Sequence, residues 1–123
     1  MHEFGVAASV LEAVDVRAAG RSVDAVCLHV GALQRLDRDV FDQAFAMIAD
    51  GGVAEGAAVE VVEVAVVVRC RACAAEATAG ELITTCPACA GHDLELVHGD
   101  DLVLASITLA DRDAPARAEQ EVG

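Results

Sequence analysis

Four cysteines in the second half of the chain fall into two pairs whose spacing is typical of a metal site. Cys70 and Cys73 form one CxxC pair, and Cys86 and Cys89 form another, with twelve residues between the pairs. Two such knuckles can close on one tetrahedral ion, and thiolates bind zinc well because it is a borderline-soft cation. Four thiolates leave no open position for water, so the spacing predicts a structural zinc site.

The cysteine spacing does not by itself choose the metal or the role. Rubredoxin-like iron sites use the same ligands, but redox iron usually sits among aromatic side chains, and the chain has no Trp and no Tyr. Zinc is therefore favoured. Cys27 lies outside the pattern and is interpreted as a small strand residue. His29 is likewise interpreted as a strand residue. His92 and His98 follow the second pair and are either exposed loop residues or spare ligands, because imidazole suits zinc and nickel.

The first three residues form a second candidate metal site. Met1 is expected to be retained before His2, because methionine is normally removed only before a small residue. The α-amine, the deprotonated backbone nitrogen of His2 and the imidazole can form fused chelate rings, and Glu3 could complete the site. A nitrogen-rich tetragonal site favours Ni(II) or Cu(II) over zinc. Many chains carry a histidine at position 2 by chance, so this motif depends on what accompanies it.

Composition restricts the class of protein and its partners. A chain of 123 residues suits one compact unit with one or two small lobes. Its net charge of −13 disfavours nucleic acid and anionic membrane surfaces. We expect no signal peptide and no membrane-spanning segment, and hence a cytoplasmic location in which thiols stay reduced and available to metal.

Hydrophobic periodicity predicts two helices. Apolar residues recur at helical spacing over residues 4–19, and Gly20 follows them. Asp37 can cap a second helix, which Gly51 and Gly52 would end. The stripe expected to be buried on that helix is Val40, Phe41, Ala44, Phe45 and Ile48.

Strands are predicted before, between and after these features. Residues 23–30 alternate with period two, and residues 58–69 are strongly β-branched, which indicates one long strand with a bulge or with both faces buried. A last strand is expected over residues 102–109. The cysteine segment is thus an insertion between two strands. Residues 111–123 have few apolar side chains and are predicted to form a disordered tail.

These features together resemble the HypA/HybF family of nickel-incorporation proteins for the maturation of nickel–iron hydrogenases. The likeness runs in order from Met1 to about Ala110. It comprises Met1-His2-Glu3 opening a helix, Val30-Gly31 ending a strand, Ala44-Phe45 in the second helix, Ala54-Glu55-Gly56-Ala57 before the long strand, and then CxxC with CPxC.

The resemblance implies an α+β fold with two parts. A nickel-binding domain, residues 1–69 and 100–110, would have a small three-stranded sheet packed with two helices, and residues 70–99 would form an inserted zinc-ribbon-like lobe. Nickel would be bound by His2 with Met1 and Glu3, and structural zinc by Cys70, Cys73, Cys86 and Cys89.

Two further residues are implied as possible auxiliary nickel ligands. An acidic residue before the second helix assists nickel in some members, and Asp37 occupies that place, although helix capping explains it equally well. His98 is the other candidate. The chain departs from many members in carrying Ala74 where they have glycine after the first CxxC, which puts the turn of that knuckle in question but not its ligands.

Membership would make the chain a nickel carrier and not an enzyme. Family members deliver nickel to the hydrogenase large subunit with a GTPase partner, and some also serve urease. The alternative is a zinc-ribbon adaptor that binds another protein and transfers no nickel. Catalysis by the chain itself is disfavoured, because the sequence has no Gly-rich phosphate loop and no Ser/His/Asp set. Whether the chain is a monomer or a homodimer stays open.

Overall fold

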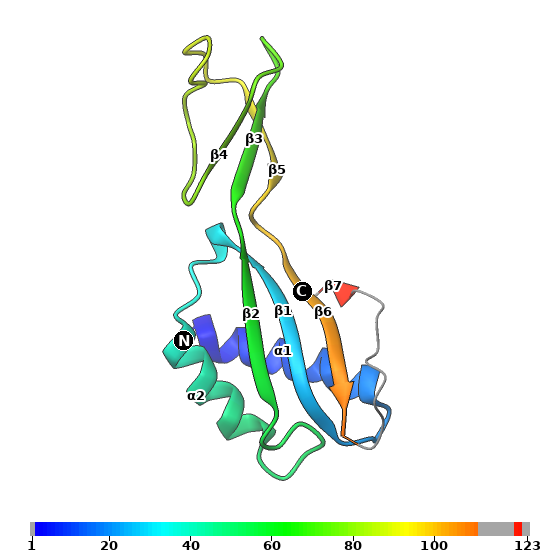
Figure 1. The fold of residues 1–123 in the computed structure, drawn as a ribbon. Coiled ribbons are helices and arrows are strands. Elements are labelled where there is room, and N and C mark those ends of the chain that lie inside the picture. The colour runs from blue at the N-terminus through cyan, green and yellow to red at the C-terminus, as the bar shows by residue number, and fades with distance from the viewer. Residues whose placement is uncertain (1, 111–119, 122–123) are drawn as a thin grey trace.

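The computed structural model describes residues 2–110 and 120–121, which form two helices and seven strands (Figure 1). In chain order these are α1 (His2–Ala18), β1 (Val23–Gly31), α2 (Arg38–Ala49), β2 (Ala58–Val64), β3 (Val66–Cys70), β4 (Glu76–Ala79), β5 (Leu94–His98), β6 (Leu102–Leu109) and β7 (Gln120–Glu121). A short 3-10 helix, Ala32–Gln34, lies between β1 and α2.

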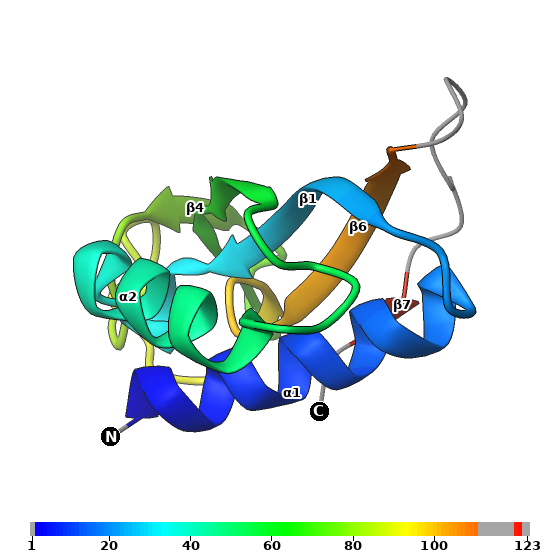
Figure 2. The same cartoon turned by 90° about the horizontal axis from the view of Figure 1, so that it is seen from below.

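The first sheet has the strand order β2-β1-β6-β7. Strands β1 and β2 are parallel, whereas β6 is antiparallel to β1 and to β7. Both helices lie against the same face of this sheet (Figure 2). The predicted three-stranded sheet with two helices is therefore present, and the short strand β7 adds a fourth strand beside β6.

The core lies between this sheet and the helices. Strand β1 contributes Val26, Leu28 and Val30 as the period-two pattern predicts, and each is at most 3% exposed. Helix α1 adds Val10 and Val14. The aromatic contribution comes mainly from Phe41 and Phe45 of α2, whose rings stack at a centroid distance of 5.9 Å.

Helix α2 differs from its prediction at one position of the buried stripe. Asp37 caps the helix as expected, since its side chain accepts a hydrogen bond from the backbone N–H of Val40. Val40 itself is 44% exposed, so its predicted burial is wrong. It lies in the first helical turn, and Ala49 completes the buried stripe instead.

The long strand predicted over residues 58–69 is two strands in two different sheets. Strand β2 pairs with β1 as far as Val64, which lies opposite Gly31 at the end of β1. After Ala65 the chain enters β3, the central strand of the sheet β4-β3-β5. The second sheet extends away from the helices (Figure 1). The single strand predicted over residues 58–69 is therefore wrong, because its two halves pair with different partners on either side of Ala65.

Two glycines make the joint between the sheets. A Cβ on Gly31 would lie 2.3 Å from the carbonyl carbon and oxygen of Gly99, and a Cβ on Gly99 would lie 2.7 Å from the Cα of Val66. Gly99 also has a φ of +117°, which side-chain-bearing residues rarely adopt. The chain therefore leaves the first sheet and returns to it through a closely packed crossing of backbones.

No helix within the described ranges is long and apolar enough to cross a membrane. The predicted disordered tail, residues 111–123, lies outside the described residues except for Gln120 and Glu121, which form β7.

Candidate metal centres

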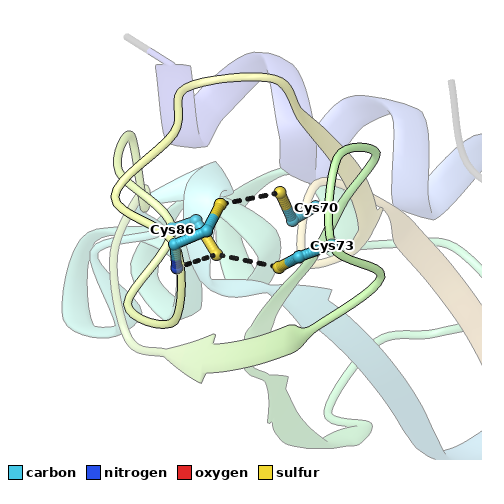
Figure 3. Close-up of side chains that lie close together, drawn as sticks. Cys70, Cys73 and Cys86 are labelled. Atoms are coloured by element: carbon cyan, nitrogen blue, oxygen red, sulfur yellow. Dashed lines mark hydrogen bonds between the residues drawn. The ribbon is translucent and has the colours of Figure 1, made fainter.

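The four paired cysteines converge at the far end of the second sheet. Cys70 is the last residue of β3, and Cys73 follows it in a tight turn, while Cys86 and Cys89 come from a matching turn before β5. Their Sγ atoms all lie within 4.8 Å of one another (Figure 3). Cys70 and Cys86 are buried, and Cys73 and Cys89 are exposed.

The sulfur positions fit a tetrahedral metal. The Sγ atoms of Cys70 and Cys89 are 3.7 Å apart, and those of Cys73 and Cys86 are 3.6 Å apart. With a zinc–sulfur bond of about 2.3 Å, two sulfurs of a regular tetrahedron lie about 3.8 Å apart. All five cysteines of the chain are free thiols in this structure. The four converging cysteines thus make a closed site for one structural metal ion.

Each cysteine pair sits on the same kind of backbone turn. The backbone N–H of Ala74 donates to the carbonyl of Cys70 and that of Ala90 to the carbonyl of Cys86, both at 2.8 Å. Ala74 and Ala90 have φ angles of 66° and 64°, in the left-handed region. The turn at Ala74, which the missing glycine put in question, is therefore formed, at the cost of a left-handed alanine.

Hydrogen bonding gives the thiols of Cys86 and Cys73 different pKa values. The backbone N–H groups of Cys89 and Ala88 donate to Cys86 Sγ at 3.4 Å each and lower the pKa of that thiol to about 6. At Cys73 the N–H of Ala75 lowers the pKa, but sharing a proton with Cys86, burial and the other sulfurs together raise it to about 12. Several thiolates at such short range repel one another, and a bound cation relieves that repulsion.

The N-terminal motif lies against the segment that joins β1 to α2. His2 Nε2 is 3.0 Å from the backbone carbonyl oxygen of Gln34. Glu3 Oε2 accepts a 2.8 Å hydrogen bond from the backbone N–H of Asp37, which lowers the pKa of the Glu3 carboxyl. Met1, the third predicted ligand, lies outside the described residues. The structure therefore brings Glu3 beside Asp37 and places His2 nearby, on the first turn of α1.

Among residues 2–110 and 120–121, the four cysteines are the one group of three or more potential ligands whose atoms converge. The side-chain ligand atoms of His2, Glu3 and Asp37 do not converge on one point. The Asp37 side chain is engaged as the cap of α2 through Val40. Any metal held by the N-terminal motif must therefore draw on backbone or terminal nitrogens.

The other histidines and Cys27 lie elsewhere. His98 ends β5 and lines a cavity of about 290 Å³ with His29 and Asp101, at the joint between the sheets. His92 Nδ1 lies 3.0 Å from the carbonyl of Thr84 within the cysteine lobe. Burial, followed by the charge and hydrogen bond of Glu60, raises the pKa of the Cys27 thiol, as suits an unreactive strand residue.

Gln34 is the residue at this site that the sequence did not single out. Its carbonyl contacts His2, and its side-chain Nε2 donates to the backbone carbonyl of Asp100 at 2.7 Å. A polar residue in a turn carries no signal of such a role, because both contacts depend on segments distant in sequence.

Fold and site together define a small α+β protein whose inserted lobe carries a closed four-cysteine metal centre. The family model described as hydrogenase/urease nickel incorporation, metallochaperone, HypA matches residues 1–109. The chain belongs to this family.

Individual relatives agree over nearly the whole chain. This chain is 34% identical over 110 residues to the hydrogenase maturation factor HypA of Desulfitobacterium hafniense, and the match covers 87% of this chain and 96% of that protein. It is 33% identical over 117 residues to that of Chlorobium limicola, covering 92% and 100%. The solution structure of the Ni metallochaperone HypA from Helicobacter pylori shares the fold, with a TM-score of 0.65 at 20% identity over 89% of this chain and 97% of that one.

Proposed function

We propose that this protein is a nickel metallochaperone of hydrogenase maturation, with nickel as its cargo and zinc as a structural metal. The observation that carries this proposal is the family match from residue 1 to residue 109, which spans both the N-terminal motif and the four cysteines. In this reading the protein has no catalysis of its own. It works in the cytoplasm with a nickel-insertion GTPase and passes nickel to the hydrogenase large subunit.

Nickel is proposed to bind at Met1, His2 and Glu3. The first four backbone N–H groups of a helix have no partner within the helix, so those of His2 and Glu3 can be deprotonated without breaking α1. Anionic nitrogens are also favoured at the positive end of the helix dipole. With the Met1 amine and the His2 imidazole, they supply the nitrogen-rich tetragonal set that suits Ni(II).

Exposure of this site supports transfer. His2 is exposed, so a partner protein can reach it. A carrier must release its cargo, which a closed cage such as the cysteine centre would hinder. Asp37 and His98 remain proposed as auxiliary ligands, Asp37 because Glu3 already contacts its backbone.

Zinc is proposed for Cys70, Cys73, Cys86 and Cys89. A d¹⁰ ion has no redox chemistry and accepts four thiolates without an open position, so its contribution is to hold the lobe together. Metal analysis of the purified protein should find about one zinc per chain, and iron in its place would overturn the assignment.

The deciding experiment compares the chain with its native Met1 terminus against the same chain with two extra N-terminal residues, both loaded with zinc. Nickel titration should show strong binding only to the native form, because the extension removes the α-amine from the chelate. Equal binding by both forms would move the site to other histidines. No binding by either form would favour a zinc-ribbon adaptor that transfers no nickel.

A further inference from the structure

The contact between His2 and Gln34 bears on which nitrogen of the imidazole is free to bind metal. A backbone carbonyl oxygen is only an acceptor, so the His2 nitrogen facing it, Nε2, must carry the hydrogen. In a neutral imidazole the other nitrogen, Nδ1, then holds the lone pair. Nδ1 is the ring nitrogen nearest the backbone, and it alone can close a small chelate ring with the backbone nitrogen of His2.

The Gln34 carbonyl is itself held in place from the joint between the sheets. The backbone N–H of Gly31 donates a hydrogen bond to the carbonyl of Asp101 at 2.7 Å, and that of Leu33 donates to the carbonyl of Gly99 at 2.8 Å. The Gln34 side chain adds a third bond, to the Asp100 carbonyl at 2.7 Å. This is the last of the three along the chain, and it acts on the very residue whose carbonyl faces His2.

We propose that Gln34 is a positioning residue for nickel capture: its carbonyl selects the His2 tautomer that can chelate, and its side chain anchors that carbonyl to the segment Gly99–Asp101. The inference rests on the proposed terminal nickel site and adds a residue to it. Metal-binding histidines commonly donate their second ring N–H to a carbonyl, which fixes ring orientation and tautomer. Here that carbonyl belongs to a segment more than thirty residues away.

The carbonyl cannot be removed by substitution, but its anchor can. Gln34→Met keeps the length of the side chain and its neutrality and loses the donor to Asp100. Gln43→Met is the matched control, because Gln43 is an exposed glutamine on α2. Both variants are to be made in the full chain with its native terminus and loaded zinc. Zinc content should be unchanged in both.

Two measurements test the proposal. Nitrogen NMR of the His2 ring, without nickel and with the imidazole neutral, should show the Nε2–H tautomer in the parent and a mixture of tautomers in Gln34→Met. Nickel affinity, measured by competition, should fall about tenfold in Gln34→Met, as expected for a group just outside the ligands, and stay within about twofold of the parent in Gln43→Met.

The possible failures separate this inference from the function. A parent with the Nδ1–H tautomer, or a Gln34→Met variant that binds nickel as tightly as Gln43→Met, would overturn the role of Gln34 and leave terminal nickel binding intact. If the N-terminal extension leaves the nickel affinity of the parent unchanged, the terminal site itself is wrong, and the positioning role falls with it. The NMR result on the parent decides the tautomer even if the variant does not fold.

Discussion

The four-cysteine centre and the N-terminal motif differ in how much of each is assembled before a metal arrives. In the cysteine lobe two matching turns already bring four sulfurs within 4.8 Å. At the N-terminus the side chains of His2 and Glu3 contact backbone atoms of Gln34 and Asp37 and form no converging set. The first arrangement suits a metal that stays, and the second suits one that must leave.

The difference has a simple physical origin. A CxxC turn positions its ligands through local backbone hydrogen bonds, and these need only the residues next to the cysteines. In the proposed nickel site the N-terminal motif instead depends on N–H groups of the first helical turn, which have no carbonyl partner in the helix and would become ligands only after losing a proton. Four predictions test how far this contrast holds, from the largest expected effect to the smallest.

Cys70→Ser should abolish zinc binding. Cys70 is 1% exposed at the end of β3, so its loss opens the centre and removes the metal that holds the lobe. Structural zinc sites contribute on the order of 10 kcal/mol, so β3, β4 and β5 should unfold while α1 and α2 persist. Zinc analysis and amide exchange measure this. Cys27→Ser is the control and should retain zinc; a Cys70→Ser protein with one zinc per chain would contradict the four-thiolate assignment.

His2→Ala should weaken nickel binding by more than about 100-fold, beyond the range typical of groups outside the ligand shell. Because His2 is exposed, the free energy of unfolding should change by less than about 0.5 kcal/mol, and zinc should be retained. Competition titration and denaturant unfolding give the two values. His98→Ala provides the comparison: a larger nickel loss in that variant than in His2→Ala would place the site in the cavity beside His29.

Gly31→Ala should destabilise the protein by about 1–3 kcal/mol, the usual cost of overpacking. Its Cβ would lie 2.3 Å from backbone atoms of Gly99, which cannot move aside as a side chain can. Urea unfolding measures the effect. Gly80→Ala is the matched control, since nothing lies within 4 Å of its Cβ. Equal stability of the two variants would mean that the crossing of the sheets is looser than the structure indicates.

Ala74→Gly should stabilise the first knuckle by about 1 kcal/mol, because a left-handed φ costs an alanine roughly that amount and costs glycine nothing. Slower loss of zinc to a chelator reports the gain. Ala72→Gly in the same turn is the control, because Ala72 does not have a positive φ; a glycine there should give no gain. Faster zinc loss from Ala74→Gly would show that unfolded-state entropy outweighs the relieved strain.

The elements that depend on local pattern were predictable. The helix at the start, the strand at residues 23–30, the Asp37 cap and the last strand at residues 102–109 follow from periodicity and capping chemistry, and the structure confirms them. The cysteine site was equally accessible, since two CxxC turns carry their geometry with them. The one misplaced side chain, Val40, lies in a first helical turn, where burial depends on the tilt of the helix against its neighbours.

Strand pairing, in contrast, was decided by tertiary structure. Residues 58–69 were predicted as one strand because β propensity is the same on both sides of Ala65. Only the pairing partners, β1 on one side and β4 with β5 on the other, divide it. The close approach of Gly31 and Gly99 and the contacts of Gln34 likewise join segments far apart in the chain. By itself the sequence determined the ligand types, their spacing and the local turns that hold them, because those are properties of neighbouring residues. Where the N-terminal motif sits, and what supports it, came from long-range packing.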